Sequence, residues 1–189
     1  AGRAVADILF GRVNPSGKLT MTFPRVVGQA PIYYNQLNTG RPKPSDDARG
    51  PISMWEDCPN SPLYPFGYGL SYTAFEYGEI QIAHTTVPED ALLEVSIPVK
   101  NTGRHPGKEI VQLYTRDLVA GIARPIKELK GFEKIHLQPS EEKTVTFHLS
   151  RDELAFWNDK GEHIFEPGEF EIHVGPNSHD TRSQKVTFE

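Results

Sequence analysis

The chain has 189 residues, of which 37% are hydrophobic and 10% aromatic, so it is long enough to bury a core. Its 16 glycines and 16 prolines indicate many turns, as in a β-rich protein. The formal net charge of −5 and the absence of a lysine and arginine cluster argue against a nucleic-acid partner. The single cysteine, Cys58, excludes an internal disulfide framework and a zinc site built on cysteines. No apolar run approaches the ~20 residues of a membrane helix, so we expect no membrane partner.

The first ten residues have the periodicity of an amphipathic helix that Gly11 is placed to end. One stripe of that helix is apolar and consists of Ala4, Val5, Ile8 and Leu9. A turn and a short strand from Leu19 to Phe23 are expected next. One helix and one strand cannot close a core. We therefore expect residues 1–37 to be the C-terminal edge of an α/β domain, and the chain to be a fragment.

Residues 38–75 show neither helical nor strand periodicity. Residues 38–62 are rich in proline, glycine and aspartate, which predicts a loop longer than the about 12–15 residues beyond which loops are usually functional or disordered. The following stretch sets aromatic side chains among glycines, namely Tyr64, Phe66, Tyr68, Tyr72 and Phe75. This density predicts a linker packed on a neighbouring surface, because glycine lets backbone and rings approach closely. A carbohydrate-binding platform is the alternative.

From residue 76 onward the pattern alternates between apolar and polar residues, as in half-buried strands. The clearest apolar phases are Val95, Ile97 and Val99; Val145, Phe147 and Leu149; and Phe170, Ile172 and Val174. Pro98 interrupts the strand that contains Val95, Ile97 and Val99, which predicts an edge strand or a bulge there. Ser150 and Glu153 match the capping box of a short helical turn. About seven strands separated by turns predict an immunoglobulin- or fibronectin-III-like β-sandwich over residues 76–189, and the fold class is mainly β.

Several stretches resemble one family, in its order and with its spacing. GRAVADILFGRVNPSGKLTMTFP is similar to the end of the α/β-sandwich domain of family 3 glycoside hydrolases, and SPLYPFGYGLSYTAFEY to the segment that follows it. NTGRHPGKEIVQLYTRD, RPIKELKGFEKIHLQPSEEKTVTF and EPGEFEIHVG resemble the fibronectin-III-like domain of that family. The bacterial periplasmic β-glucosidases are the members that the chain resembles most.

The resemblance implies a retaining, exo-acting β-glucosidase that is periplasmic or secreted and needs no cofactor. In that family an Asp nucleophile and a Glu acid/base lie upstream of Ala1, about 5–5.5 Å apart, as retention requires. We therefore expect no catalytic residue and no metal site in this chain, and no hydrolysis by the chain alone. Its partners are then the remaining catalytic domains and a β-glucoside or oligosaccharide substrate. A β-xylosidase activity and a homodimer stay open.

Trp55 and Glu56, in the long loop, are candidates for a sugar site, because an aromatic platform beside polar acceptors suits a pyranose. On this interpretation the loop forms an outer, leaving-group subsite. The alternative is a solvated acidic loop with Trp55 packed on a neighbouring domain. Arg41 and Arg49 have the donors to bind sugar hydroxyls, and ordinary ion pairs with Asp46 or Asp47 are the competing interpretation.

Three other residues are assigned structural roles. Trp157 follows the capping box and is expected in the core or as a lid of the sandwich. His148 and His173 fall on the polar phase of their strands, which predicts surface positions, and the seven histidines show no metal-ligand spacing.

Two function classes compete with the enzyme. One is a free-standing fibronectin-III-like carbohydrate-binding or adhesion module, and the other is a structural spacer. The apolar stripe at Val5, Ile8 and Leu9 argues against a finished module, which would not expose it.

Overall fold

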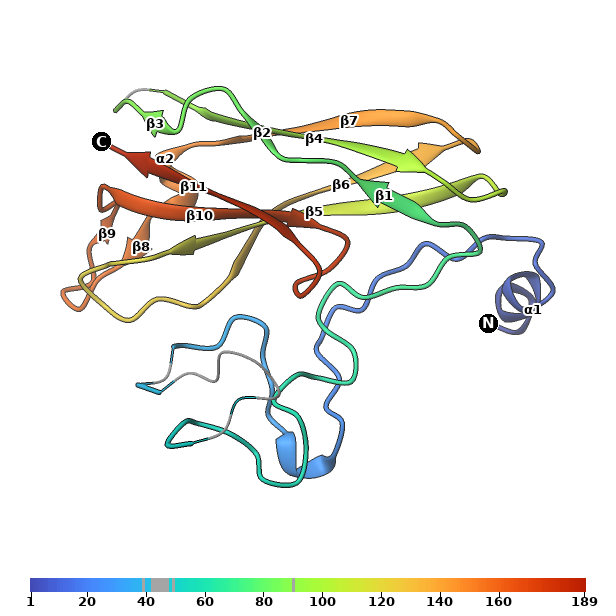
Figure 1. Cartoon of the computed structure of the whole chain (residues 1–189), viewed down its shortest axis with the longest axis horizontal. Helices are drawn as coiled ribbons and strands as arrows, with labels where there is room; N and C mark the ends of the chain where they lie inside the picture. Colours follow the sequence, from blue (N-terminus) through green and yellow to red (C-terminus); the bar gives the residue numbers. More distant parts are fainter. Residues whose placement is uncertain (39, 42–47, 49, 90) are drawn as a thin grey trace.

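The computed structural model describes residues 1–38, 40–41, 48, 50–89 and 91–189. A β-sandwich forms most of it, and the described part of residues 1–74, here called the N-terminal segment, lies at one end and along one face of that sandwich (Figure 1). In the described residues no helix has the length and apolar character needed to cross a membrane.

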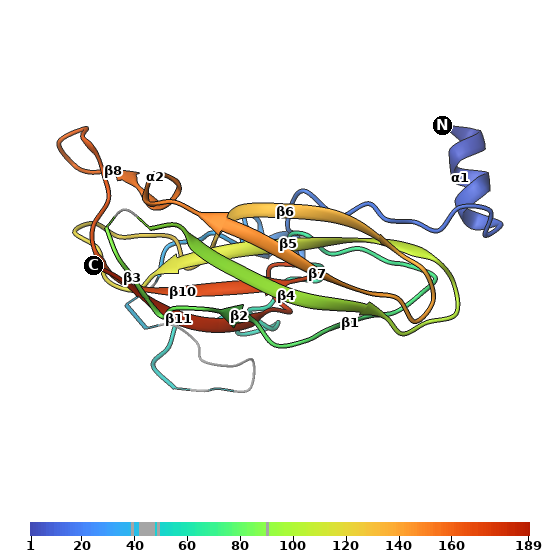
Figure 2. The ribbon, with the colours of Figure 1, turned by 90° about the horizontal axis from the view of Figure 1, so that it is seen from above.

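The sandwich consists of two antiparallel sheets that face each other (Figures 1 and 2). The first sheet contains β1 (Phe75–Tyr77), β2 (Gln81–Ile82), β4 (Leu93–Asn101) and β7 (Glu142–Leu149). The second has the order β3 (Thr86–Val87), β11 (Arg182–Phe188), β10 (Gly168–Gly175), β5 (Gly107–Asp117) and β6 (Glu128–Leu137). Within it, only the short β3–β11 pair is parallel. The fibronectin-III-like sandwich expected from the sequence is confirmed.

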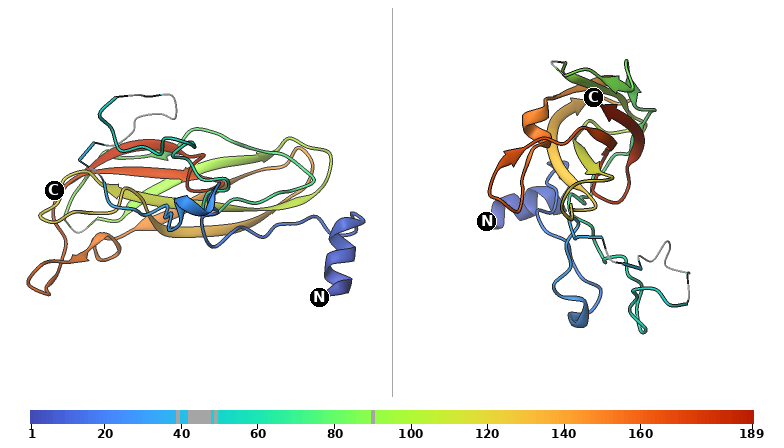
Figure 3. Two further views of the ribbon diagram at one scale, coloured as in Figure 1. Left: turned by 90° about the horizontal axis from the view of Figure 1, so that it is seen from below. Right: turned by 90° about the vertical axis from the view of Figure 1, so that its left-hand side faces the viewer.

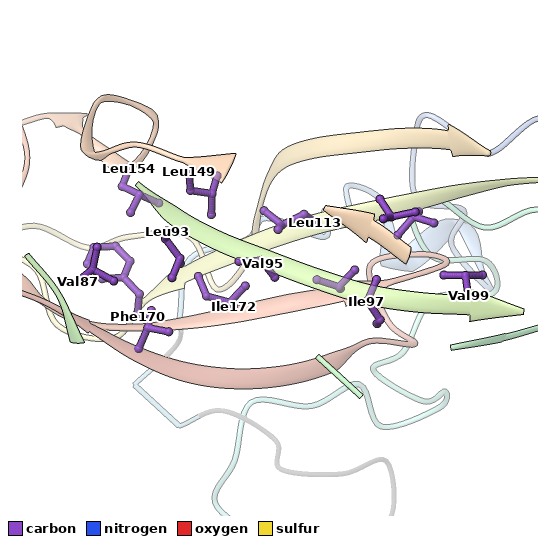
Figure 4. Close-up of a cluster of buried hydrophobic side chains, with 14 of the residues drawn as sticks. Val87, Leu93, Val95, Ile97, Val99, Leu113, Leu149, Leu154, Phe170 and Ile172 are labelled. Carbon is purple, nitrogen blue, oxygen red and sulfur yellow. The ribbon is translucent and has the colours of Figure 1, made fainter. Parts of the chain in front are cut away.

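The core lies between the sheets, where the predicted apolar phases meet (Figure 4). Val95, Ile97 and Val99 of β4 face the second sheet and are fully buried. Ile172 and Val174 of β10 meet them from the other side. Because side chains alternate across a strand, each polar neighbour points away from this core.

The expectation that Pro98 marks an edge strand is wrong, because β4 pairs with β7 on one side and with β1 and β2 on the other. Pro98 lies where neither β1 nor β2 is in register with β4. There its carbonyl accepts a hydrogen bond from Gly78 N at 2.9 Å. The missing N–H of the proline therefore falls in an interruption of the ladder, where it costs no strand hydrogen bond.

The expected N-terminal helix is present as α1 (Gly2–Leu9), and Gly11 follows it with the positive φ of 72° that suits glycine. None of its residues is buried, and Figure 2 shows α1 beyond the end of the sandwich. The hydroxyl of Tyr72 donates to the carbonyl of Ile8 at 2.6 Å. The apolar stripe of α1 is left largely uncovered.

The strand expected at Leu19–Phe23 is reduced to an extended stretch beside residues 64–68, with one bridge between Phe23 and Tyr64. Hydrogen bonds form at its ends, from Leu19 N to Tyr68 O at 2.8 Å and from Phe23 N to Tyr64 O at 2.9 Å. In the middle, the carbonyl of Phe66 accepts from Ser178 N of the sandwich instead. A 3₁₀ turn, η1 (Val27–Gln29), follows.

The predicted capping box is confirmed: Ser150 N donates to the Glu153 carboxylate at 2.7 Å at the start of α2 (Arg151–Leu154). A hairpin of β8 (Phe156–Trp157) and β9 (His163–Ile164) comes next and projects from the sandwich (Figure 3). Phe156 points inward, so its neighbour Trp157 points outward and is 67% exposed. The expectation of a core position for Trp157 is therefore wrong; its ring packs on that of His163 at 5.1 Å.

A buried ion pair joins the N-terminal segment to the sandwich. Lys18 Nζ lies 2.8 Å from Glu109 Oε1 of β5, and the two side chains are only 13% and 6% exposed. The hydroxyl of Tyr77 donates to the same oxygen at 2.9 Å. Burial and the Glu109 charge raise the pKa of Tyr77, so this phenol stays a donor.

Replacing Lys18→Met should cost about 3–5 kcal/mol of unfolding free energy, because Glu109 is left buried without its cation. The double variant Lys18→Met/Glu109→Gln should recover most of this loss, since it removes the unpaired charge. Equilibrium urea unfolding measures both. The matched control is Lys108→Met, at an exposed neighbouring position, which should change stability by less than about 0.5 kcal/mol. A Lys18 effect no larger than that of the control would contradict the assignment.

Candidate functional site

The outer face of the second sheet carries polar and aromatic side chains that the N-terminal segment covers. His173 of β10 and Tyr114 of β5 are in register on this face, as are Glu171 and Arg116. Tyr34 packs on it edge-to-face with Tyr114, at 5.8 Å between ring centroids. His173 is buried, at 9% exposure, so its predicted surface position is wrong; Thr181 Oγ1 lies 3.3 Å from its Nδ1 and Glu171 lies beside its Nε2. His148, in the first sheet, is exposed as expected.

The aromatic run of residues 64–75 packs rather than forming an open platform. Tyr34 stacks on Phe66 at 4.3 Å, and Tyr64 stacks on Tyr68 at 5.0 Å. Gly67 has a φ of 79°, and a Cβ there would fall 2.0 Å from the amide oxygen of Gln112. That amide donates to the carbonyls of Gly67 at 3.2 Å and Pro176 at 2.7 Å. Only glycine fits this approach of the linker to β5.

A hollow of about 840 Å³ lies between the N-terminal segment and the sandwich. We call it the Trp55 hollow. One wall comes from the N-terminal segment and contains Gln36, Leu37, Asn38, Ser53, Met54, Trp55 and Asn60. The opposite wall comes from the sandwich and contains Arg116, Ile126, Lys127 and His173. A second hollow of about 480 Å³ shares Trp55, Gln36 and Lys127 with the first and also contains Tyr33 and Tyr34.

Trp55 is 41% exposed and is held by a small turn. Its backbone N–H donates to the side-chain oxygen of Asn60 at 3.0 Å, and the Asn60 amide donates to the carbonyl of Ser53 at 2.9 Å. One asparagine therefore fixes both ends of the tripeptide that carries the indole.

The structure does not bring the three predicted site residues together. Arg41 accepts a hydrogen bond at its carbonyl from Ser53 N at 2.8 Å, which places its backbone near the hollow, but Arg41 is exposed and does not line it. Glu56 is exposed and lines neither hollow. The expectations for Asp46, Asp47 and Arg49 fall outside the described residues.

Burial and neighbouring cations shift the pKa values of the residues in the sandwich wall of the hollow. Burial lowers the pKa of Lys127 to about 8; its ammonium donates to Ser178 O at 2.8 Å and Thr181 Oγ1 at 3.2 Å. Burial, followed by the Lys127 charge, lowers the pKa of His173 to about 4, although Glu171 acts in the opposite direction. His173 Nε2 lies 3.3 Å from Glu171 Oε2 but is not aligned for a hydrogen bond. Among the described residues, no group of three or more His, Cys, Asp or Glu side chains has an arrangement that could hold a metal ion.

Two family models match the chain. Residues 1–72 match the glycosyl hydrolase family 3 C-terminal domain, and residues 109–178 match the fibronectin type III-like domain. The chain belongs to the family 3 glycoside hydrolases. The segment boundaries at residues 37 and 75 stay predictions.

Relatives of this family 3 chain align with almost all of it. A periplasmic β-glucosidase of Salmonella typhimurium is 46% identical over 188 residues, which are 100% of this chain and 24% of the relative. A β-xylosidase of Formosa agariphila is 46% identical over 178 residues, 94% of this chain and 24% of that protein. The crystal structure of a Listeria innocua β-glucosidase in complex with glucose has a TM-score of 0.93 at 45% identity, covering 99% of this chain and 26% of that one. The chain thus spans about a quarter of the length of these relatives.

The sequence of this family 3 chain did not predict the wall of the Trp55 hollow that comes from the sandwich. Arg116, Lys127 and His173 stand more than 50 residues from Trp55 in the sequence, and no local motif marks them. Because Arg116 and His173 lie on the polar phase of their strands, they look like solvent-facing residues. Residues 36–38 and the turn at Trp55, which form the opposite wall, make them parts of a cavity.

Replacing His173→Gln should make the stability less sensitive to acid. Below a pKa of about 6.5 the unfolded state takes up a proton at this residue, whereas the folded state does so only near 4. Stability contributed by neutral His173 is therefore present above pH 6.5 and is lost as the pH falls toward 4, up to about 3 kcal/mol. Lys127, with its pKa of about 8, is protonated throughout this window.

The measurement is the free energy of unfolding at intervals between about pH 7 and pH 4, for the wild type and His173→Gln. His148→Gln, at an exposed position in the other sheet, is the control and should follow the wild type. Parallel curves for all three proteins would contradict a buried, neutral His173.

Proposed function

We propose that this chain is the C-terminal portion of a retaining, exo-acting β-glucosidase that removes terminal β-D-glucosyl units from β-glucosides and oligosaccharides. Its sandwich braces the catalytic domains, and the catalytic Asp and Glu come from other parts of the same protein. Support comes from relatives named β-glucosidase that align with nearly the full chain at 45–46% identity.

The observation that carries this proposal is an uneven distribution of exposed apolar side chains. Nineteen large hydrophobic side chains are exposed in the described part of the chain, and fifteen of them fall within residues 1–72, the span of the family 3 C-terminal domain match. They include Leu9, Phe10, Val27 and Leu70, whereas most of the sandwich surface is polar. A concentration of exposed apolar side chains in one part of a chain is characteristic of an interface. Coverage by the catalytic domains accounts for it, and a free-standing binding module or a spacer does not.

Trp55 supports a leaving-group subsite at the edge of the protein's active site. Its indole is 41% exposed and lines two hollows, and its backbone is held by Asn60, as expected of a platform for a pyranose ring. In this proposal Arg41 and Glu56, at either side of the turn, donate and accept hydrogen bonds with sugar hydroxyls from the exposed end of the loop.

A β-xylosidase is the second candidate, because a relative of that name is as similar to this chain as the β-glucosidases are. The two sugars differ in the hydroxymethyl group at C5. Parallel kinetics of the full-length protein on aryl β-glucoside and aryl β-xyloside separate the two activities.

The proposed location is the periplasm or the extracellular space, since the Salmonella typhimurium relative is named a periplasmic enzyme. A homodimer remains a prediction, which sedimentation of the full-length protein tests.

The full-length protein should hydrolyse 4-nitrophenyl β-D-glucoside with retention of configuration, whereas the isolated 189-residue chain should not. The reason is that the chain supplies a scaffold without a nucleophile. Product anomers are followed by NMR and rates by absorbance. Turnover that scales with the concentration of the isolated chain would overturn the placement of the catalytic carboxylates.

Replacing Trp55→Ala in the full-length protein should raise KM for a β-linked glucose disaccharide by about three- to tenfold, because a stacking surface is lost. The KM for an aryl glucoside with a smaller leaving group should change less. Trp157→Ala is a matched control, since Trp157 is also exposed but lies on the β8–β9 hairpin. Equal effects of the two tryptophan substitutions would contradict a subsite at Trp55.

A further inference from the structure

Arg116 has more unused hydrogen-bonding capacity than its charged neighbours in the Trp55 hollow. Its closest acidic group is Glu171 on the adjacent strand, at 3.8 Å between Nη1 and Oε2, which is beyond a hydrogen bond. Within the described parts of the chain the guanidinium makes no hydrogen bond, and the side chain is 36% exposed. A guanidinium has five N–H donors in a planar fork, so Arg116 can bind a further acceptor without losing an existing bond.

Two other polar groups of the hollow, Lys127 and Asn60, are already engaged. Two of the three Lys127 protons go to Ser178 and Thr181, and its ammonium lies 5.7 Å from the centroid of the Tyr114 ring. Asn60 uses both ends of its amide to hold the turn at Trp55. These groups shape the site, and Arg116 is left to recognise a ligand.

The lining of the hollow is positively charged. Arg116 and Lys127 contribute cations, and none of the described residues that line it is acidic. Glu171 lies behind the wall, beside Arg116 and His173, and is not part of the lining. Concave sites with low-dielectric walls focus such fields, so this site favours an anionic group over a neutral one.

Trp55 narrows the chemical class of that anion. An indole face offers apolar surface to the C–H face of a pyranose, and the amides of Gln36 and Asn38 offer donors and acceptors for hydroxyl groups. An inorganic anion would bind Arg116 and gain nothing from the apolar face of Trp55. A volume of about 840 Å³ is within the range of small-molecule sites, ~300–1,000 Å³.

We propose that the Trp55 hollow binds an anionic sugar, a uronoside whose carboxylate pairs with Arg116 while its ring packs against Trp55. A carboxylate and a guanidinium match in geometry and form two parallel hydrogen bonds. The inference rests on the proposed function, because it assigns an acidic sugar to the leaving-group side of the same enzyme. The sandwich thereby contributes a specificity-determining residue, Arg116, on the wall opposite the loop.

The test is isothermal titration calorimetry on the full-length protein with methyl β-D-glucuronoside, methyl β-D-glucoside and sodium acetate. Arg116→Gln removes the charge, Arg116→Lys keeps it without the fork, and Arg104→Gln is the control at an exposed arginine in the β4–β5 turn. The wild type and Arg104→Gln should bind the glucuronoside about tenfold or more tightly than either comparison ligand. Arg116→Gln should abolish this preference, and Arg116→Lys should restore part of it.

Equal affinity for glucuronoside and glucoside, or a preference that persists in Arg116→Gln, would overturn the proposal. Acetate binding as tight as glucuronoside binding would also overturn it, since the site would then recognise a carboxylate without a sugar. Hydrolysis of 4-nitrophenyl β-D-glucoside, measured on the same preparations, reports on the proposed function separately. Normal hydrolysis without Arg116-dependent binding rejects the inference alone, whereas absent hydrolysis rejects the function.

Discussion

The ion pair between Lys18 and Glu109 is the contact on which the placement of the N-terminal segment depends. Two opposite charges are buried together, and Tyr77 adds a hydrogen bond to the carboxylate. Such a pair is strongly favoured over either charge alone, so it fixes which part of the segment meets β5. Farther along β5, Gln112 binds the carbonyl of Gly67. β5 thus contacts the N-terminal segment at two places, Lys18 and Gly67.

From these two anchors follows the geometry of the cavity. With the linker held on β5, Tyr34 and Phe66 stack beside Tyr114, and the chain that contains Gln36 runs along the start of β6. The turn at Trp55 then faces the sandwich across open space. The two walls of the hollow belong to different structural units, so its positive charge and its aromatic surface come from opposite sides.

The sequence predicted the sandwich well, because burial on one face leaves a period of two in β4, β7 and β10. It predicted the exposure of individual residues poorly wherever other parts of the chain pack over the polar phase of a strand. His173 reads as a surface residue because its strand neighbours do not show that Lys127 and Thr181 lie beside it. Trp157 reads as a core residue because the projection of its hairpin has no local signal. Pro98 does not mark an edge strand, because its missing N–H faces the gap between β1 and β2, where no strand hydrogen bond is lost. The chemistry of Trp55 made it a candidate, but Arg116 was not one, since the two residues meet at one hollow only through tertiary structure.

The covered outer face of the second sheet has a consequence for how this architecture evolves. Gln112 and Tyr114 are fitted to the preceding segment, and Gly67 tolerates no side chain where the two meet. Recombination between Gly67 and β5 would join surfaces that do not match. The module and the segment that precedes it should therefore be inherited together, as one unit of exchange.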